Sequence, residues 1–173
     1  MFKRNLILSI LLFPAMIIYS QDIETKLKEL NIELPPIGQP IANYVHVVRS
    51  GNLLFLAGKG PSNANGEFIT GKVGKDLTIE EGQAAARLTA INQIAVLKAE
   101  LGNLNKVKRI VKVLGMVNCD TDFTDHPKVI NGCSELFAQV WGDDNGVGAR
   151  SAVGMGSLPG NIAVEIEGIF EIE

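Results

Sequence analysis

The chain has 173 residues, of which 46% are hydrophobic and 20% charged, with 16 basic against 19 acidic side chains. This length fits one ordinary domain with a full core, and no internal repeat or low-complexity tract divides the sequence. The net negative charge and the lack of a basic patch argue against nucleic-acid binding, which draws its affinity from cationic contacts to phosphates.

Residues 1–20 are predicted to be a signal peptide. A basic start at residues 3–4 precedes an apolar run over residues 6–18, and the sequence turns polar at Ser20. The apolar run is shorter than the roughly 20 residues that a transmembrane helix needs, although an uncleaved N-terminal anchor is the alternative. We therefore expect cleavage near Ser20 and a single mature domain over residues 21–173, periplasmic or secreted, with no membrane attachment. Its net charge would be −5, from 14 basic and 19 acidic side chains.

The first elements expected in the mature chain are a short helix and a β-hairpin. Residues 22–31 can form the helix, before several prolines force an extended chain. Residues 44–49 and 53–57 are rich in β-branched and aromatic side chains, and the turn residues between them predict a hairpin. A glycine-rich loop is expected over residues 58–74.

Two longer helices follow, each with a recognisable start and stop. The first begins at a capping box over residues 78–81 and ends at Gly102. The second begins near Asp125, because Pro127 is tolerated only in a first turn, and it ends at Gly142. The apolar stripe expected on the first helix comprises Leu88, Ile91, Ile94, Ala95, Leu97 and Leu101.

Three further strands are predicted at residues 106–118, 151–153 and 162–173. In the first of these, alternation places Ile110 on the face of the lysines and Val113 on the other face. In the last, apolar and acidic residues alternate. The order strand-strand-helix-strand-helix-strand-strand predicts an α+β fold, with a mixed β-sheet and two helices packed on one face.

The sheet face that the helices leave open is predicted to mediate self-association. Apolar positions such as Val111, Val113, Ile166 and Phe170 are expected on it and would need a partner surface. A closed cyclic assembly covers such a surface without leaving open ends.

The two cysteines and the two histidines do not form a metal-binding motif. Cys119 closes a strand-like run and Cys133 lies in a helix-like run, so buried free thiols are favoured over a disulfide, although export implies an oxidising compartment. No cysteine or histidine follows a metal-ligand spacing such as C-x-x-C. We expect neither a metal nor a cofactor.

Several short motifs follow one another along residues 40–173. They are Asn43-Tyr44, Ala57-Gly58-Lys59-Gly60-Pro61, Val129-Ile130-Asn131 with Leu136-Phe137, Ala149-Arg150-Ser151, Leu158-Pro159 and Val164-Glu165-Ile166-Glu167. In this order and spacing they resemble the signature of the Rid (YjgF-type, L-PSP-like) reactive-intermediate deaminase family. The resemblance implies a chorismate-mutase-like fold and a trimer with a cleft at each subunit interface.

In this resemblance, Arg150 and Glu165 are the catalytic residues. A guanidinium presents a planar fork that binds a carboxylate bidentately, so Arg150 would hold the substrate carboxylate. The alternative is a structural arginine that bridges to Glu165 or to a neighbouring subunit. The residue matched by Glu165 helps to position the attacking water. The other acids of the last strand, Glu167, Glu171 and Glu173, are interpreted as solvent-exposed or subunit-contact residues.

Four further positions are implied to bind substrate. Backbone groups near Gly58 would hold one end of it, Tyr44 could offer a hydroxyl, and Asn131 could fix the loops. Packing or capping roles are equally open for Tyr44 and Asn131. Lys59 stands where a glutamine is common in the family, and Ala152 where a cysteine is common. These departures indicate a divergent branch with a reshaped pocket, which the predicted signal peptide makes an exported one.

The resemblance predicts hydrolytic deamination of small reactive 2-imino or enamine acids to 2-oxo acids and ammonia in an intersubunit cleft. Such a reaction needs orientation and a polarised carbon more than a strong nucleophile. Two alternatives stay open: a non-catalytic trimer that binds a small carboxylate, and a ribonuclease-type member, which the acidic charge argues against. The expected partners are a small carboxylate and further copies of the chain, with neither nucleic acid nor membrane.

Overall fold

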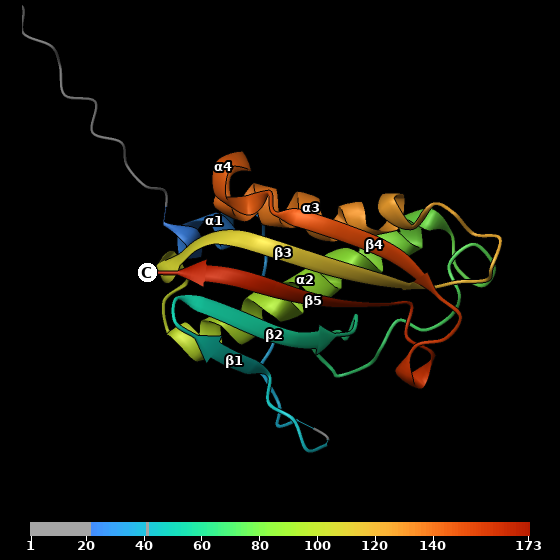
Figure 1. Ribbon diagram of the computed structural model, residues 1–173, viewed down its shortest axis with the longest axis horizontal. Coiled ribbons are helices and arrows are strands. Elements are labelled where there is room, and N and C mark those ends of the chain that lie inside the picture. Colours follow the sequence, from blue (N-terminus) through green and yellow to red (C-terminus); the bar gives the residue numbers. More distant parts are fainter. Residues whose placement is uncertain (1–21, 41) are drawn as a thin grey trace, which may run out of the picture.

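The computed structural model describes residues 22–40 and 42–173, so the predicted signal peptide lies outside the described residues. Five strands form one mixed sheet in the order β1-β2-β5-β3-β4 (Figure 1). β3 and β4 run parallel, whereas the other neighbouring strands are antiparallel. The elements are α1 Ile23–Glu29, β1 Val47–Ser50, β2 Leu53–Lys59, α2 Ile79–Leu101, η1 Leu104–Lys106, β3 Val107–Asn118, α3 His126–Trp141, α4 Asp143–Gly146, β4 Ala149–Met155, η2 Pro159–Asn161 and β5 Val164–Ile172.

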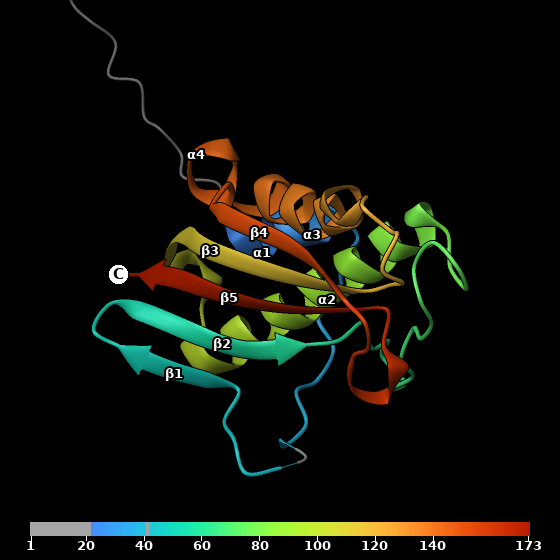
Figure 2. The same ribbon diagram turned by 45° about the vertical axis from the view of Figure 1, so that its right-hand side comes forward.

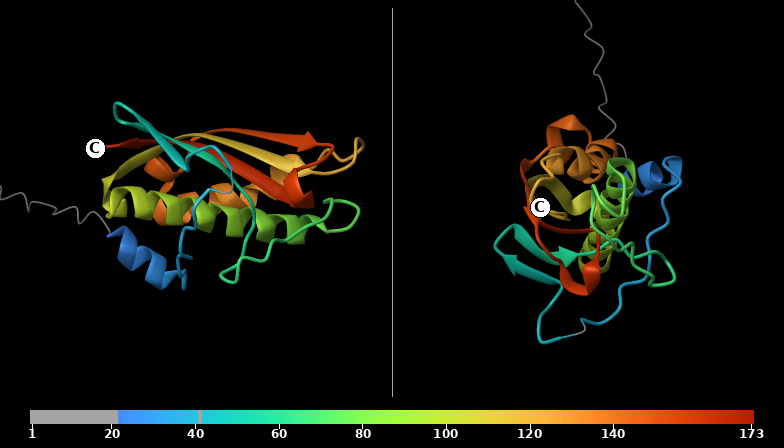
Figure 3. Two further views of the ribbon diagram at one scale, coloured as in Figure 1. Left: turned by 90° about the horizontal axis from the view of Figure 1, so that it is seen from below. Right: turned by 90° about the vertical axis from the view of Figure 1, so that its right-hand side faces the viewer.

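The two long helices lie side by side against one face of the sheet. Figure 3 shows α2 and α3 on the same side of it, with the other face open. The turned view in Figure 2 shows the five strands side by side, with β1 and β4 at the two edges. This arrangement confirms the predicted α+β class and the predicted order of strands and helices. Its buried core includes Leu54, Ile94, Leu97, Ile130, Leu136, Phe137, Ile166 and Phe170.

The predicted helix boundaries agree with the structure because local capping determines them. The Thr78 hydroxyl accepts a bond from the Glu81 backbone N–H at 3.1 Å, and the Glu81 carboxylate accepts one from the Thr78 N–H at 2.8 Å. Gly102 ends α2 in the left-handed region, with φ of 69°. α3 begins with Pro127 in its first turn and ends before Gly142.

The buried face of α2 includes Ile94, Ala95 and Leu97 of the predicted apolar stripe, but not all of the stripe. Leu88 and Ile91 are half-buried, whereas small residues such as Ala86 and Ala90 are fully buried. Small side chains let the backbones of two helices approach closely, and α3 contributes Gly132 to this contact. The prediction rests on apolar residues at helical spacing, whereas the close packing of α2 on α3 also depends on small residues.

Gly132→Ala is expected to destabilise the protein by about 1–3 kcal/mol or more, the usual range for overpacking. A Cβ at this position would overlap the backbone carbonyl oxygen of Gln83 in α2, and backbone atoms cannot rotate away. Gly156→Ala is the matched control, because a Cβ there meets nothing within 4 Å. Urea unfolding measures both, and equal midpoints for the two variants would contradict the close helix contact.

Two β-bulges in β3 change which side chains face the helices. The pairing of β3 with β5 shifts register between Val107 and Arg109 and again between Ile110 and Lys112. A bulge adds one residue to one strand and so reverses the alternation beyond it. Ile110 is therefore buried under the helices together with Val113, and the prediction that it shares a face with the lysines is wrong.

Three of the four apolar residues predicted for the open face of the sheet are buried instead. Val113, Ile166 and Phe170 are buried within the chain, so they cannot form the surface predicted to mediate self-association. Phe55, which is 40% exposed, lies on the open face instead. It borders a hollow of about 340 Å³ that is also lined by Leu114 and Ile169.

Glu171 is buried, which corrects its interpretation as a solvent-exposed or subunit-contact residue. Its side chain accepts bonds from Lys108 Nζ at 2.7 Å and from Arg109 Nε at 2.6 Å, and the residue is 7% exposed. The first bulge explains this pairing, because it turns two consecutive residues of β3 toward one residue of β5. The bonds from Lys108 and then Arg109 hold the pKa of Glu171 below its ordinary value.

Candidate functional site

A groove of about 670 Å³ lies where β2 ends and β5 begins, and it brings four of the predicted site residues together. They are Tyr44, Gly58, Lys59 and Glu165. Residues 35–39 form one wall, and the rest of the lining includes Phe68, Asn92 and Ile162. Concave sites with apolar walls and a few convergent polar groups are typical of small-molecule binding.

A β-bulge at the end of β2 brings Gly58 against Glu165. The pairing of β2 with β5 gains one residue between Leu56 and Lys59. A Cβ on Gly58 would overlap the Glu165 carboxylate, so the carboxylate lies directly over the Gly58 backbone. Only glycine permits that approach, which gives this position a steric reason for its residue type.

The environment of Glu165 favours its protonated form. Burial in the groove is the main cause that raises the pKa of Glu165, and the negative charge of Glu167 two residues along β5 adds to it. A carboxyl group whose pKa moves toward neutrality can exchange protons with a substrate at working pH. The pKa of Glu165 is therefore shifted in the direction that a carboxyl group acting as a general acid or base requires.

Two adjacent amides of α2 brace the loop that carries Gly58. Asn92 Nδ2 donates to the carbonyl oxygens of Gly60 and Ser62, each at 3.0 Å. Gln93 Nε2 donates to Ala57 O at 3.2 Å and to the β5 backbone at 2.5 Å. Both amide side chains are almost fully buried. Any movement of the loop that broke these bonds would leave buried polar groups unpaired, which is costly, so the bonds hold the loop in place.

Lys59 occupies the groove without a carboxylate partner. Its Nζ lies 2.6 Å from His46 Nδ1, and the other nitrogen of that ring lies 2.8 Å from Gly38 O. Within residues 22–40 and 42–173, no acid lies within ion-pair distance of this amine. Burial lowers the pKa of Lys59.

Arg150 and Asn131, the other two predicted site residues, contact each other at a separate place. Arg150 Nη1 donates to Asn131 Oδ1 at 2.8 Å and to Ser134 Oγ at 3.1 Å. Both partners are neutral, and no ion pair of Arg150 occurs within the described part of the chain. The guanidinium borders a hollow of about 180 Å³ next to Val147. The structural alternative, a bridge from Arg150 to Glu165, is absent from these contacts.

Within one chain, Arg150 and Glu165 lie on opposite faces of the sheet. The bonds of Arg150 to α3 place its guanidinium on the helix side. Glu165 lies between Val164 and Ile166, which are buried under the helices, so its side chain points to the open face. Figure 1 also shows that β4 begins near α4, whereas β2 ends and β5 begins at the opposite end of the sheet.

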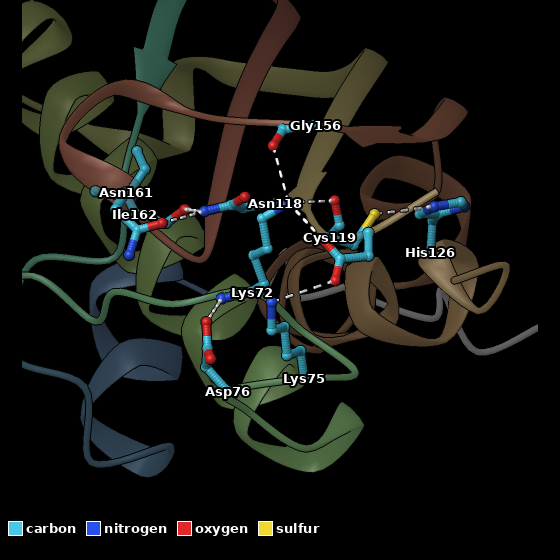
Figure 4. Close-up of polar contacts among 10 residues, drawn as sticks. Lys72, Lys75, Asp76, Asn118, Cys119, His126, Gly156, Asn161 and Ile162 are labelled. Atoms are coloured by element: carbon cyan, nitrogen blue, oxygen red, sulfur yellow. Dashed lines mark hydrogen bonds and ion pairs between the residues drawn. The ribbon is translucent and has the colours of Figure 1, made fainter. Parts of the chain in front are cut away.

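A network around Lys72 and Asn118 positions the turn that borders the groove (Figure 4). Lys72 Nζ donates to Asp120 Oδ1 at 2.7 Å, to Gly156 O at 3.0 Å and to the Cys119 carbonyl at 3.1 Å. The buried Asn118 amide donates to Asn161 Oδ1 at 3.0 Å and to the Ile162 carbonyl oxygen at 3.1 Å. These bonds tie the ends of β3 and β4 to the start of β5, next to the groove.

Comparison with known proteins identifies the family. A family model described as "YjgF/chorismate_mutase-like, putative endoribonuclease" matches residues 24–163, which is most of the chain. The chain belongs to the YjgF/chorismate-mutase-like family. This confirms the resemblance found in the motifs and the chorismate-mutase-like fold that it implied.

Individual proteins similar to this chain align with most of its length. Protein TCP17 of Trypanosoma cruzi is 40% identical over 156 residues, which covers 90% of this chain and 98% of the relative. The 2-iminobutanoate/2-iminopropanoate deaminase of Dermatophagoides farinae is 30% identical over 143 residues, covering 82% and 95%. The crystal structure of Atu1372 from Agrobacterium tumefaciens, a protein with unknown function, is 45% identical with a TM-score of 0.81, covering 89% and 96%. The family thus includes an imine deaminase, while its own description names endoribonucleases.

Three residues beside the groove were missed in the sequence. Asn92 and Gln93 could have been found as two consecutive amides inside an otherwise apolar helical run. The sequence predicts His46 to lie in a strand. Its contact with Lys59 depends on the position of residues 35–39, because the Gly38 carbonyl orients the imidazole ring, and no local sequence pattern shows this.

The two cysteines lie outside the groove as buried free thiols, as predicted. Burial raises the pKa of Cys133 to about 12, and burial also raises the pKa of Cys119, which lies 3.4 Å from His126 Nε2. Among the described residues, no group of His, Cys, Asp and Glu large enough to hold a metal ion occurs. None of the helices within 22–40 and 42–173 has the length and apolar character to cross a bilayer.

Proposed function

We propose that this protein hydrolyses small 2-imino or enamine acids to 2-oxo acids and ammonia, in a cleft shared by two copies of the chain. The observation that carries the proposal is the Arg150 guanidinium, which is exposed, charged and held only by neutral oxygens within the described residues. Such a fork is free to take a substrate carboxylate in a bidentate pair. The imine-deaminase name of the mite relative supports the same reaction class.

Glu165 would supply the proton transfers of the reaction. Water adds to C2 of the imino acid to give a carbinolamine, and the loss of ammonia from this intermediate leaves the 2-oxo acid. One proton must leave the water and one must reach the departing nitrogen. A single carboxyl group with a raised pKa can do both in turn. Backbone groups at Gly58 and the Tyr44 hydroxyl in the same groove would orient the substrate.

The separation of Arg150 from Glu165 supports a shared cleft. Opposite sheet faces cannot meet within one chain, but a second copy can bring its Arg150 edge to the groove of the first. The exposed Phe55 and the hollow beside it on the open face supply an apolar surface for such a contact. A closed three-fold assembly would form three equivalent clefts.

Export is part of the proposal, and it changes the source of substrate. A mature chain that starts near Gln21 would meet imines formed outside the cytoplasm, for example by amino-acid oxidases. N-terminal sequencing of protein recovered from the periplasm or medium is expected to begin near this residue. Intact Met1 on a cytoplasmic pool would contradict it.

Ammonia release tests the reaction directly. Imino acids are generated in place by an amino-acid oxidase with catalase present, and ammonia formation is followed with and without the purified mature protein. The protein is expected to accelerate the release, with saturation in imino acid. Carboxylate binding without acceleration would favour a non-catalytic binder. Cleavage of RNA in place of imine hydrolysis would favour the ribonuclease-type alternative, which the acidic charge disfavours.

A further inference from the structure

The groove contains an amine in an unusual setting for a lysine. The Lys59 side chain is half-buried beside Tyr44 and Ile162, and no described carboxylate lies within ion-pair distance of it. Most lysines reach solvent or an acid, because an ammonium is strongly hydrated. Partial desolvation without an anion destabilises the charged form and increases the share of neutral, nucleophilic amine.

His46 is oriented to accept a proton from this amine. Its Nε2 lies 2.8 Å from the Gly38 carbonyl oxygen, and only an N–H can satisfy that acceptor. The hydrogen-bond partners therefore assign the proton to Nε2 and leave a lone pair on Nδ1. That lone pair faces Lys59 Nζ at 2.6 Å. A nucleophile next to a base that a third group orients is the arrangement of an activated nucleophile.

We propose that the Lys59 amine condenses with the carbonyl carbon of a 2-oxo acid in the groove, forming an imine and releasing water. The choice of 2-oxo acids rests on the proposed function, whereas the covalent capture itself rests on Lys59 and His46. The apolar walls at Pro36, Ile37 and Phe68 fit an acid with a large apolar side chain. A groove of about 670 Å³ also lies in the size range of drug-sized ligands rather than of a three-carbon acid.

The chemistry balances without an oxidant or cofactor. His46 Nδ1 takes a proton from the ammonium, and the neutral amine attacks the carbonyl carbon, so that a C–N bond forms and the carbonyl oxygen becomes a hydroxyl. Loss of that hydroxyl as water leaves the C=N bond, and addition of water reverses every step. The same amine can attack C2 of a 2-imino acid and expel ammonia, which gives the hydrolysis a covalent route through Lys59.

Reductive trapping tests the capture. The full mature protein is incubated with phenylpyruvate and sodium cyanoborohydride, which reduces an imine to a stable secondary amine, and is then analysed by intact mass and peptide mapping. We expect one adduct per chain, mapped to Lys59. Pyruvate is expected to give at least a several-fold lower yield, because its methyl group leaves the apolar walls uncovered.

Three variants separate capture at this site from random lysine chemistry. Lys59→Gln is expected to abolish the mapped adduct. Lys106→Arg, which removes an exposed lysine bonded to a backbone carbonyl, is expected to leave the yield unchanged. His46→Gln keeps a polar side chain but removes the basic nitrogen, and trapping is expected to slow by about a hundredfold or more, within the usual range for loss of a general base.

The outcomes distinguish this inference from the proposed function. Adducts spread over several surface lysines, or no adduct at Lys59 while imine hydrolysis proceeds, would overturn the inference and leave hydrolysis intact. A specific adduct at Lys59 without any acceleration of ammonia release would support the inference and refute the hydrolysis. A wild-type rate of trapping in His46→Gln would show that His46 does not act as the base.

Discussion

Arg150→Ala is expected to lower imine hydrolysis by a factor of ten to several hundred. A charge-assisted hydrogen bond contributes about 1.5–3 kcal/mol in net terms, and each 1.4 kcal/mol is about tenfold in binding or rate. Arg150→Lys should recover little, because an ammonium cannot copy the planar fork. Steady-state kinetics with oxidase-generated imino acids measures the loss in kcat/KM.

The matched control for this variant is Arg87→Ala. Arg87 Nη1 also donates to a neutral amide oxygen, that of Gln139 at 3.0 Å, but it lies on α2 away from the groove. Its removal should leave hydrolysis unchanged. A purely structural Arg150 would instead lower the melting temperature or dissociate the assembly when truncated, and lysine would partly repair it. An Arg150→Ala protein with full activity would remove this residue from the site.

Glu165→Gln is expected to lower hydrolysis by about a hundredfold or more, within the range for loss of a general acid or base. The same change is expected to raise the melting temperature near pH 7. Burial raises the pKa of Glu165 in the folded chain, so its ionised form is less favourable in the folded than in the unfolded state. This destabilisation is absent below the unfolded pKa, grows as pH rises from there toward the raised pKa and is complete above it. The advantage of glutamine should therefore vanish below about pH 4, under the ordinary pKa of a glutamate.

Glu167→Gln is the control for the loss of one acid from β5. Glu167 is exposed and its charge adds to the raised pKa of Glu165, so its removal should shift the acidic limb of the rate profile to lower pH. Most of the activity at pH 7 should remain. Equal losses in Glu165→Gln and Glu167→Gln would show that the acidic strand acts through its overall charge, which would contradict a specific proton transfer by Glu165.

The sequence was sufficient for the parts of the fold that short-range chemistry determines. The capping box at Thr78 and the first-turn Pro127 placed both long helices, because these signals act within one turn. The faces of β3 were predicted incorrectly, because each bulge depends on the partner strand and leaves no local mark. Ile110 and Glu171 changed environment for this reason.

The candidate site was predicted unevenly, for a related reason. The motifs that resemble the family pointed to Arg150 and Glu165 as site residues. Alternation along a single strand, however, cannot show that these two side chains lie on opposite faces of the sheet. The bracing amides Asn92 and Gln93 were missed, because a buried polar residue is recognised only when its partners are known. The pairing of Lys59 with His46 needs the fold of residues 35–39 over the hairpin.

Subunit complementation tests the central claim most directly. Arg150→Ala and Glu165→Gln chains are co-expressed with two different affinity tags, and mixed assemblies are isolated by purification on both tags. In a mixed three-fold ring, one of the three clefts joins an intact Arg150 to an intact Glu165, so about one third of wild-type activity should return. Neither parent assembly alone should exceed about a tenth of wild-type activity, on the losses expected above. Mixed assemblies as inactive as their parents would contradict a catalytic cleft shared between copies of the chain.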